Sequence, residues 1–159
     1  QSNTWGSLYQ TESDPEKIKS WIADQQLTLP ANIIEAIDKV LPAFKGDKGI
    51  NNQSYLRELL IGTAKHESSA GTRLIQGGGG PARGAFQIEP KTAKDIVNTS
   101  GLIGKKAEKL LGKSKNEILE MNDEEINEFL LDHTVNSVFA IAKYLQAADQ
   151  KGKLKELKG

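Results

Sequence analysis

The feature that most limits the fold is the stretch of residues 64–93, in which a glycine-rich loop interrupts a chain whose other apolar residues recur mostly at helical spacing. Four consecutive glycines lie at residues 77–80, and Pro81 follows them. Such a run cannot sustain a helix, because glycine and proline are the least favourable residues in a helix interior. We therefore expect several helices around one irregular segment. Sequence rules tend to fail where function overrides them, so this segment is also the expected functional region.

Two short stretches, residues 73–76 and 84–88, lie on either side of the glycines. They are the only plausible strands in the chain, and the turn between them predicts a small β-hairpin. The expected fold class is therefore mainly α, with a helical domain that carries a small β-hairpin beside a cleft.

Helix starts and apolar stripes place the expected helices. The residue pairs that can form capping boxes are Ser13 with Glu16, Ser114 with Glu117, and Asn122 with Glu125. The longer helices with clear apolar stripes are expected at residues 30–44, 54–68, 90–100 and 134–148. These ranges predict helices on both sides of the glycine-rich stretch.

The length of 159 residues fits one domain with a sizeable core. We expect an N-terminal arm over residues 1–12, whose first residues are a cloning remnant. A single domain is expected over residues 13–149, and a Lys-rich C-terminal tail over residues 150–159. No run of about 18 apolar residues exists, so no membrane-spanning helix is predicted.

The charge balance argues against nucleic acid as a partner, because 21 basic and 21 acidic residues cancel. The lysines within residues 105–115 are interpreted as a solvated helix face, since Glu108 interrupts the run. The chain has no cysteine, which rules out disulfides and thiolate zinc sites. No metal site and no cofactor are expected.

Glu67 is the candidate catalytic residue, because it ends an apolar helical stripe. Leu56, Leu60, Thr63 and Glu67 step by four, three and four residues, which places them on one helix face. Contact with apolar side chains removes hydrating water from a carboxylate, and the helix C-terminus adds partial negative charge nearby. Both effects favour the protonated form that a general acid needs. The alternative is a solvated glutamate in the last turn of an amphipathic helix.

Two other motifs fail in this segment. His66 and Glu67 begin an HExxH pattern, but Ala70 stands where zinc binding requires the second histidine. The other histidine, His133, cannot share that helix face. The glycine run lacks the Gly-Lys-Ser/Thr of a phosphate-binding loop, and Pro81 removes an amide where a helix start would offer one.

A further pattern in the segment consists of Glu-Ser at 67–68, a variable loop, Gly-Ala-Phe-Gln-Ile at 84–88, and Pro-x-Thr-Ala at 90–93. It resembles the signature of lysozyme-like lytic transglycosylases and goose-type lysozymes. Its His-Glu-Ser, Gly-Pro-Ala and Phe-Gln-x-Glu-Pro combination is similar to phage-encoded members of that superfamily. Asn136, followed by Tyr-Leu at 144–145, resembles a later helix of the family.

The resemblance implies a lysozyme-like α+β fold and cleavage of the β-1,4 bond between N-acetylmuramic acid and N-acetylglucosamine in peptidoglycan. It makes Glu67 the general acid and base, positioned by Ser68, and places Gln87 against an N-acetyl sugar. The remaining substrate-binding candidates are Phe86, Gly84, Arg83 and Arg73. The two arginines flank the glycine loop, where they would meet peptidoglycan carboxylates or simply be solvated.

Glycoside hydrolysis commonly uses a second carboxyl, and the nearest by position are Glu89, Asp95 and Asp132. Helix capping explains Glu89, exposure explains Asp95, and capping of the next helix explains Asp132. The family's transglycosylase route is therefore expected. In that route one glutamate acts as acid and then base, the substrate's N-acetyl group participates, and a 1,6-anhydromuramoyl product forms. Hydrolysis is the open alternative.

One family motif is missing, because Gln-Ala-Ala-Asp at 146–149 stands where Tyr-Asn-Ala-Gly is usual. This difference favours a second hypothesis, a lysozyme-like domain that holds glycan without cutting it, as a structural component of a virion or secretion apparatus. The retained Glu67, Ser68 and Gln87 favour the enzyme. On either hypothesis we expect peptidoglycan strands as the partner and action at the bacterial cell wall, in the periplasm, outside the cell or from a virion.

Overall fold

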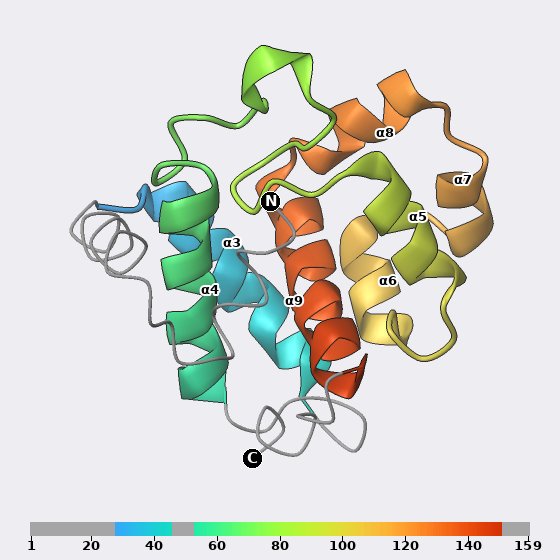
Figure 1. The fold of residues 1–159 in the computed structure, drawn as a ribbon. Coiled ribbons are helices and arrows are strands. Elements are labelled where there is room, and N and C mark those ends of the chain that lie inside the picture. The colour runs from blue at the N-terminus through green and yellow to red at the C-terminus, as the bar shows by residue number, and fades with distance from the viewer. Residues whose placement is uncertain (1–27, 46–52, 151–159) are drawn as a thin grey trace.

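The computed structural model describes residues 28–45 and 53–150, with side chains described as far as residue 147. This part of the chain is mainly helical (Figure 1). Its helices are α3 (Ala31–Val40), α4 (Gln53–Glu67), α5 (Pro90–Asn98), α6 (Lys105–Leu111), α7 (Lys115–Leu119), α8 (Asp123–Leu130) and α9 (His133–Gln150), with 3-10 turns η1 (Leu41–Phe44) and η2 (Gly77–Gly79). The helix expected from Ser13, the N-terminal arm and the tail beyond residue 150 lie outside the described residues.

Helix α9 is the centre of the fold. It packs against α3, α5, α6 and α8, and Figure 1 shows α3 and α4 on one side of it and α5 to α8 on the other. Residues 135–142 are all buried, so this part of α9 is covered on every side. Within the described ranges, no helix is long and apolar enough to cross a membrane.

The predicted helix starts after the interruption are confirmed by their hydrogen bonds. Ser114 Oγ accepts the Glu117 amide at 3.1 Å, and Glu117 Oε1 accepts the Ser114 amide at 2.9 Å. Asn122 and Glu125 form the same reciprocal capping box at the start of α8. These contacts join residues three apart in the sequence and mark the starts of α7 and α8, which is why sequence alone located them.

The helix expected at residues 30–44 is shorter than predicted, because α3 ends at Val40 and η1 follows. Pro42 lacks an amide proton and its ring clashes with the preceding turn of an α-helix, so the chain tightens into a 3-10 turn there. Leu41 and Phe44 of η1 are nevertheless buried. The apolar stripe was therefore correct even though the helix type changes.

The prediction of a β-hairpin from residues 73–76 and 84–88 is wrong. The described part of the chain contains only isolated β-bridges there, from Ile75 to Arg83 and from Arg83 to Ile88. Arg83 and Ile88 exchange two backbone hydrogen bonds of 2.9 Å, so residues 83–88 close on themselves as a tight loop. Positive φ angles of 86° at Gly84 and 50° at Gln87 reverse the chain within it. The apolar residues of this loop are buried in the core. Over so few residues, a buried loop has the same apolar pattern in the sequence as a short strand.

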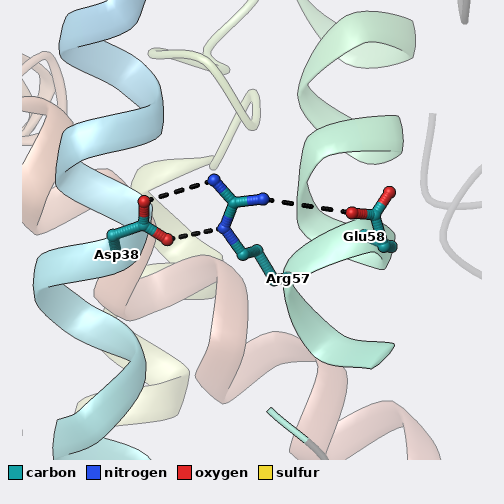
Figure 2. Close-up of polar contacts among 3 residues, drawn as sticks. All are labelled: Asp38, Arg57 and Glu58. Carbon is teal, nitrogen blue, oxygen red and sulfur yellow. Dashed lines mark hydrogen bonds and ion pairs between the residues drawn. The ribbon is translucent and has the colours of Figure 1, made fainter. Parts of the chain in front are cut away.

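An exposed ion pair links α3 to α4 (Figure 2). Arg57 Nε donates to Asp38 Oδ1 at 2.7 Å and Arg57 Nη2 donates to Asp38 Oδ2 at 3.3 Å, while Glu58 lies farther away at 3.9 Å. The Arg57 and Asp38 side chains are 37% and 48% exposed, so water screens the attraction.

We expect Arg57→Ala to lower the free energy of unfolding by less than about 1 kcal/mol, because exposed ion pairs contribute little. Urea unfolding of the variant and the wild type measures the difference. A loss of several kcal/mol would contradict this expectation and would mean that the pair fixes the position of α4.

Candidate active site

Glu67 is the last residue of α4, and its side chain is half-buried with the oxygen Oε2 buried. Leu56, Leu60 and Thr63 of the predicted stripe are fully buried on the same helix. The Thr63 hydroxyl contacts the Tyr144 hydroxyl of α9, which ties the turn before Glu67 to the central helix. The carboxyl therefore lies at the edge of the core and is not the fully solvated helix-end residue of the alternative interpretation.

Ser68 closes the end of α4. Its hydroxyl donates to the Ala64 carbonyl at 2.8 Å and accepts the Gly71 amide at 3.0 Å, and the side chain is fully buried. These bonds hold the chain as it leaves the helix directly after Glu67. The position of Ser68 thus suits the predicted role of orienting Glu67, through the backbone that both residues share.

Backbone strain is concentrated in this segment. Among the described residues, the non-glycine residues with positive φ are Ser69 at 50°, Ala70 at 58° and Gln87 at 50°. Left-handed geometry costs a residue with a Cβ about 1–3 kcal/mol, and it persists where the surrounding structure enforces it. Such strain is typical of functional sites. All three residues lie in the segment that follows Glu67 and leads to α5.

A cavity of about 230 Å³ opens beside Glu67. Four parts of the chain contribute to its wall, namely the end of α4, the segment before and at the glycines, the loop leading into α5, and α9. The lining residues are Glu67, Arg73, Ile75, Gln76, Gly77, Ala82, Gln87, Glu89, Thr92 and Lys143. The structure therefore brings three of the predicted site residues, Glu67, Arg73 and Gln87, to one cavity.

Gln87 lines the cavity, but its amide nitrogen also holds the wall together. Nε2 donates to the carbonyls of Arg73, Leu74 and Gly84 at 3.0, 3.1 and 3.0 Å. These bonds connect the segment before the glycines to the loop before α5. The sequence pattern implied a sugar contact for Gln87, and the structure adds this scaffolding role.

Phe86 and Gly84 lie behind the cavity. Phe86 is fully buried in the core, and its amide donates to Asn136 Oδ1 at 2.9 Å. Asn136 Nδ2 donates to the carbonyls of Arg83 and Leu130 at 2.9 and 2.8 Å. Asn136 thus fastens the loop to the start of α9 and the end of α8, and neither Phe86 nor Gly84 is among the residues that line the cavity.

The two predicted arginines occupy different places. Arg73 is exposed and lines the cavity, where its guanidinium is accessible to an anionic substrate. Arg83 instead donates from Nη1 to the carbonyls of Gly80 and Ala82 at 2.7 and 2.9 Å. Its side chain shapes the glycine loop, and it does not line the cavity.

Of the three candidate second carboxylates, Glu89 is the one that lines the cavity with Glu67. Glu89 occupies the N-cap position of α5, but its side chain makes no capping hydrogen bond, so the capping explanation was wrong for its side chain. Asp132 does cap α9, accepting the Val135 amide at 3.0 Å. Asp95 is exposed on α5, as expected. Within the described ranges, no three His, Asp or Glu side chains gather as metal ligands.

Lys143 was missed by sequence reasoning. It projects from α9 into the cavity lining, and burial lowers its pKa because the ammonium loses hydration, while the charges of Glu67 and Glu89 raise it. Burial is the larger effect, so the net pKa is lowered. The sequence did contain a signal for this residue. Lys143 directly follows a run of residues that α9 buries, and a cation in such a place needs anionic neighbours.

No protein-family model matches the chain, and no curated protein or solved structure matches it either. The fold and the cavity together define a mainly helical protein with two carboxylates and two cations at one site. The chemistry of that site, and not the fold alone, therefore indicates the function.

Proposed function

We propose that this protein is a peptidoglycan-cleaving glycosidase that breaks the β-1,4 bond between N-acetylmuramic acid and N-acetylglucosamine. The observation that carries the proposal is the half-buried Glu67 carboxyl in the wall of a cavity, where the sequence pattern requires the acid. A carboxyl partly removed from water and accessible from a cavity has the environment of a general acid. The lysozyme-like fold belongs to the same proposal.

The cavity suits part of a polymer better than a whole small ligand. Its volume of about 230 Å³ is below the about 300–1,000 Å³ of typical small-molecule sites. Its rim includes Arg73, Gly77 and Glu89, which are exposed, and Ile75, which is 58% exposed. A glycan strand crossing this rim would find apolar surface for sugar faces and charged groups for its hydroxyl and carboxyl substituents.

In the transglycosylase route, Glu67 donates its proton to the glycosidic oxygen as the bond from that oxygen to the anomeric carbon breaks. The N-acetylglucosamine side leaves as an alcohol, and positive charge develops at the anomeric carbon of the muramoyl residue. The substrate's N-acetyl group stabilises this charge. The 6-hydroxyl of the same sugar then attacks, its proton returns to the Glu67 carboxylate, and a 1,6-anhydro product forms.

Glu89 supports hydrolysis as the second candidate route. Its exposed carboxylate lines the same cavity as Glu67, which removes the earlier ground for excluding a second carboxyl. As a base it would take a proton from water attacking the anomeric carbon, and as a nucleophile it would form a covalent intermediate. Both variants of hydrolysis end in a reducing sugar.

Mass spectrometry of soluble products tests the function and separates the routes. Purified peptidoglycan is incubated with the wild type, Glu67→Gln and Glu89→Gln. Anhydro products that disappear only in Glu67→Gln would establish the transglycosylase, whereas reducing products that disappear in both variants would establish the two-carboxylate hydrolase. No products from the wild type would reject the enzyme.

A pull-down on insoluble peptidoglycan then tests the non-catalytic alternative, a glycan-holding component of a virion or secretion apparatus. Binding by the wild type without any release of products would support it. In both cases the place of action that we propose is the bacterial cell wall, reached from the periplasm, from outside the cell or from a virion.

A further inference from the structure

Lys143 lies beside both cavity carboxylates but comes from a different part of the fold. Glu67 ends α4, Glu89 precedes α5, and Lys143 belongs to the central helix α9, yet all three line one cavity. Burial lowers the pKa of Lys143, and the charges of both glutamates raise it. Each carboxylate is therefore close enough to act on the ammonium.

The electrostatic interaction is mutual. Because the Glu67 charge favours the charged ammonium, the ammonium in turn favours the ionised form of the Glu67 carboxyl. Glu67 is the more buried of the two glutamates, so loss of hydration acts more strongly on its carboxylate than on that of Glu89.

One further charged residue lines the cavity with Lys143 and the two glutamates. Arg73 is the remaining titratable residue of the cavity lining, and it is exposed, so solvent screens its field. Helices α3, α6 and α8 also pack against α9, but their described residues contribute none to the lining. Of the two cations that line the cavity, Lys143 is therefore the partly buried one.

We infer that Lys143 is a positioning residue for the proposed reaction, and that its ammonium sets the pH at which Glu67 passes from acid to base. This inference rests on the proposed function for its catalytic meaning. A general acid that must later accept a proton works best when it changes state near the working pH. Partial burial of Glu67 favours its protonated form, and the Lys143 ammonium favours its carboxylate. The alternative is a lysine whose methylene stem only fills space along α9.

Carbon-13 NMR of the glutamate side-chain carboxyls tests the coupling without requiring activity. In Lys143→Met, which keeps the stem and removes the charge, we expect the titration midpoint of Glu67 to rise by about one pH unit. Lys143→Arg, which restores a cation, should return the midpoint close to that of the wild type. The exposed Glu58 on α4 serves as the internal control and should not shift. An unmoved Glu67 midpoint in Lys143→Met would overturn the inference.

Titration of Lys143 in Glu67→Gln tests the same coupling if Lys143→Met does not fold. In Glu67→Gln the lysine is untouched, and loss of the neighbouring negative charge should lower the pKa of Lys143 further, observed through its Cε resonance. A Lys143 titration identical to that of the wild type would contradict the coupling.

The pH dependence of kcat/KM on peptidoglycan links the coupling to catalysis. We expect the alkaline limb in Lys143→Met to move up by about one pH unit, because the acid form of Glu67 persists to higher pH. Equal loss of activity at every pH, with the limb unmoved, would reduce Lys143 to a packing residue. If the wild type cuts no peptidoglycan, the proposed function fails, while the NMR titrations still decide whether Lys143 controls the pair.

Discussion

Glu67→Gln should lower kcat on peptidoglycan by about 10²–10⁴-fold, the contribution that a positioned general acid usually makes. The substitution keeps the size of the side chain and the hydrogen-bonding capacity of one oxygen, but the amide has no proton to give to the glycosidic oxygen. Because both proposed routes begin with that proton, the loss is expected in the transglycosylase and the hydrolase alike. Release of soluble muropeptides with time measures it.

The matched control is Glu58→Gln, which makes the same chemical change on the exposed face of the same helix. It should keep the wild-type rate. Glu67→Asp should retain part of the activity, because it keeps the acid and withdraws it toward the backbone. A Glu67→Gln enzyme of full activity would exclude Glu67 as the acid, and a variant that unfolds at lower temperature would have to be measured below its transition.

The parts of the fold that sequence located best are those fixed by local chemistry. The capping boxes at Ser114 and Asn122 start helices as predicted, since the bonds that make them involve residues three apart. The apolar stripes of α3 and α4 were equally readable, because burial repeats at helical spacing. What these signals do not contain is the direction in which one helix lies against another.

Sequence reasoning failed where long-range contacts set the conformation. Residues 84–88 look like a strand by composition, but they form a loop that Asn136 of α9 holds against that helix, by accepting the Phe86 amide and donating to the Arg83 carbonyl. Nothing local to the loop encodes a partner about fifty residues away. A positive φ at Gln87 is likewise invisible in the sequence, because a glutamine gives no sign that its backbone is left-handed.

For the candidate site, residues of the glycine-rich stretch form part of the cavity wall, and Glu67 lines the same cavity from the end of the predicted stripe. Two members were not assigned to the site this way. Glu89 had a sufficient local explanation as a cap, and only the cavity shows where its carboxylate goes. Lys143 is separated from Glu67 by most of the domain's sequence, so their pairing follows from how α9 lies in the fold.

Gly84 is the residue where the loop is most sensitive to substitution. Its φ of 86° is in the left-handed region, and a Cβ at this position would lie 2.2 Å from Asn136 Nδ2 and 2.3 Å from Asn136 Cγ. Asn136 cannot move aside, because its side chain bonds to Phe86, Arg83 and Leu130. A methyl group would therefore have to break a buried hydrogen-bond network in addition to straining the backbone.

We expect Gly84→Ala to lower the free energy of unfolding by about 3 kcal/mol, the sum of left-handed strain and overpacking. Urea unfolding followed by circular dichroism measures it. Gly77→Ala is the matched control, since no atom lies within 4 Å of a Cβ there and its φ is not positive; it should change stability by less than about 1 kcal/mol. Equal effects at both positions would mean that the contact between Gly84 and Asn136 does not hold the loop on α9, and the cavity wall would then need another anchor.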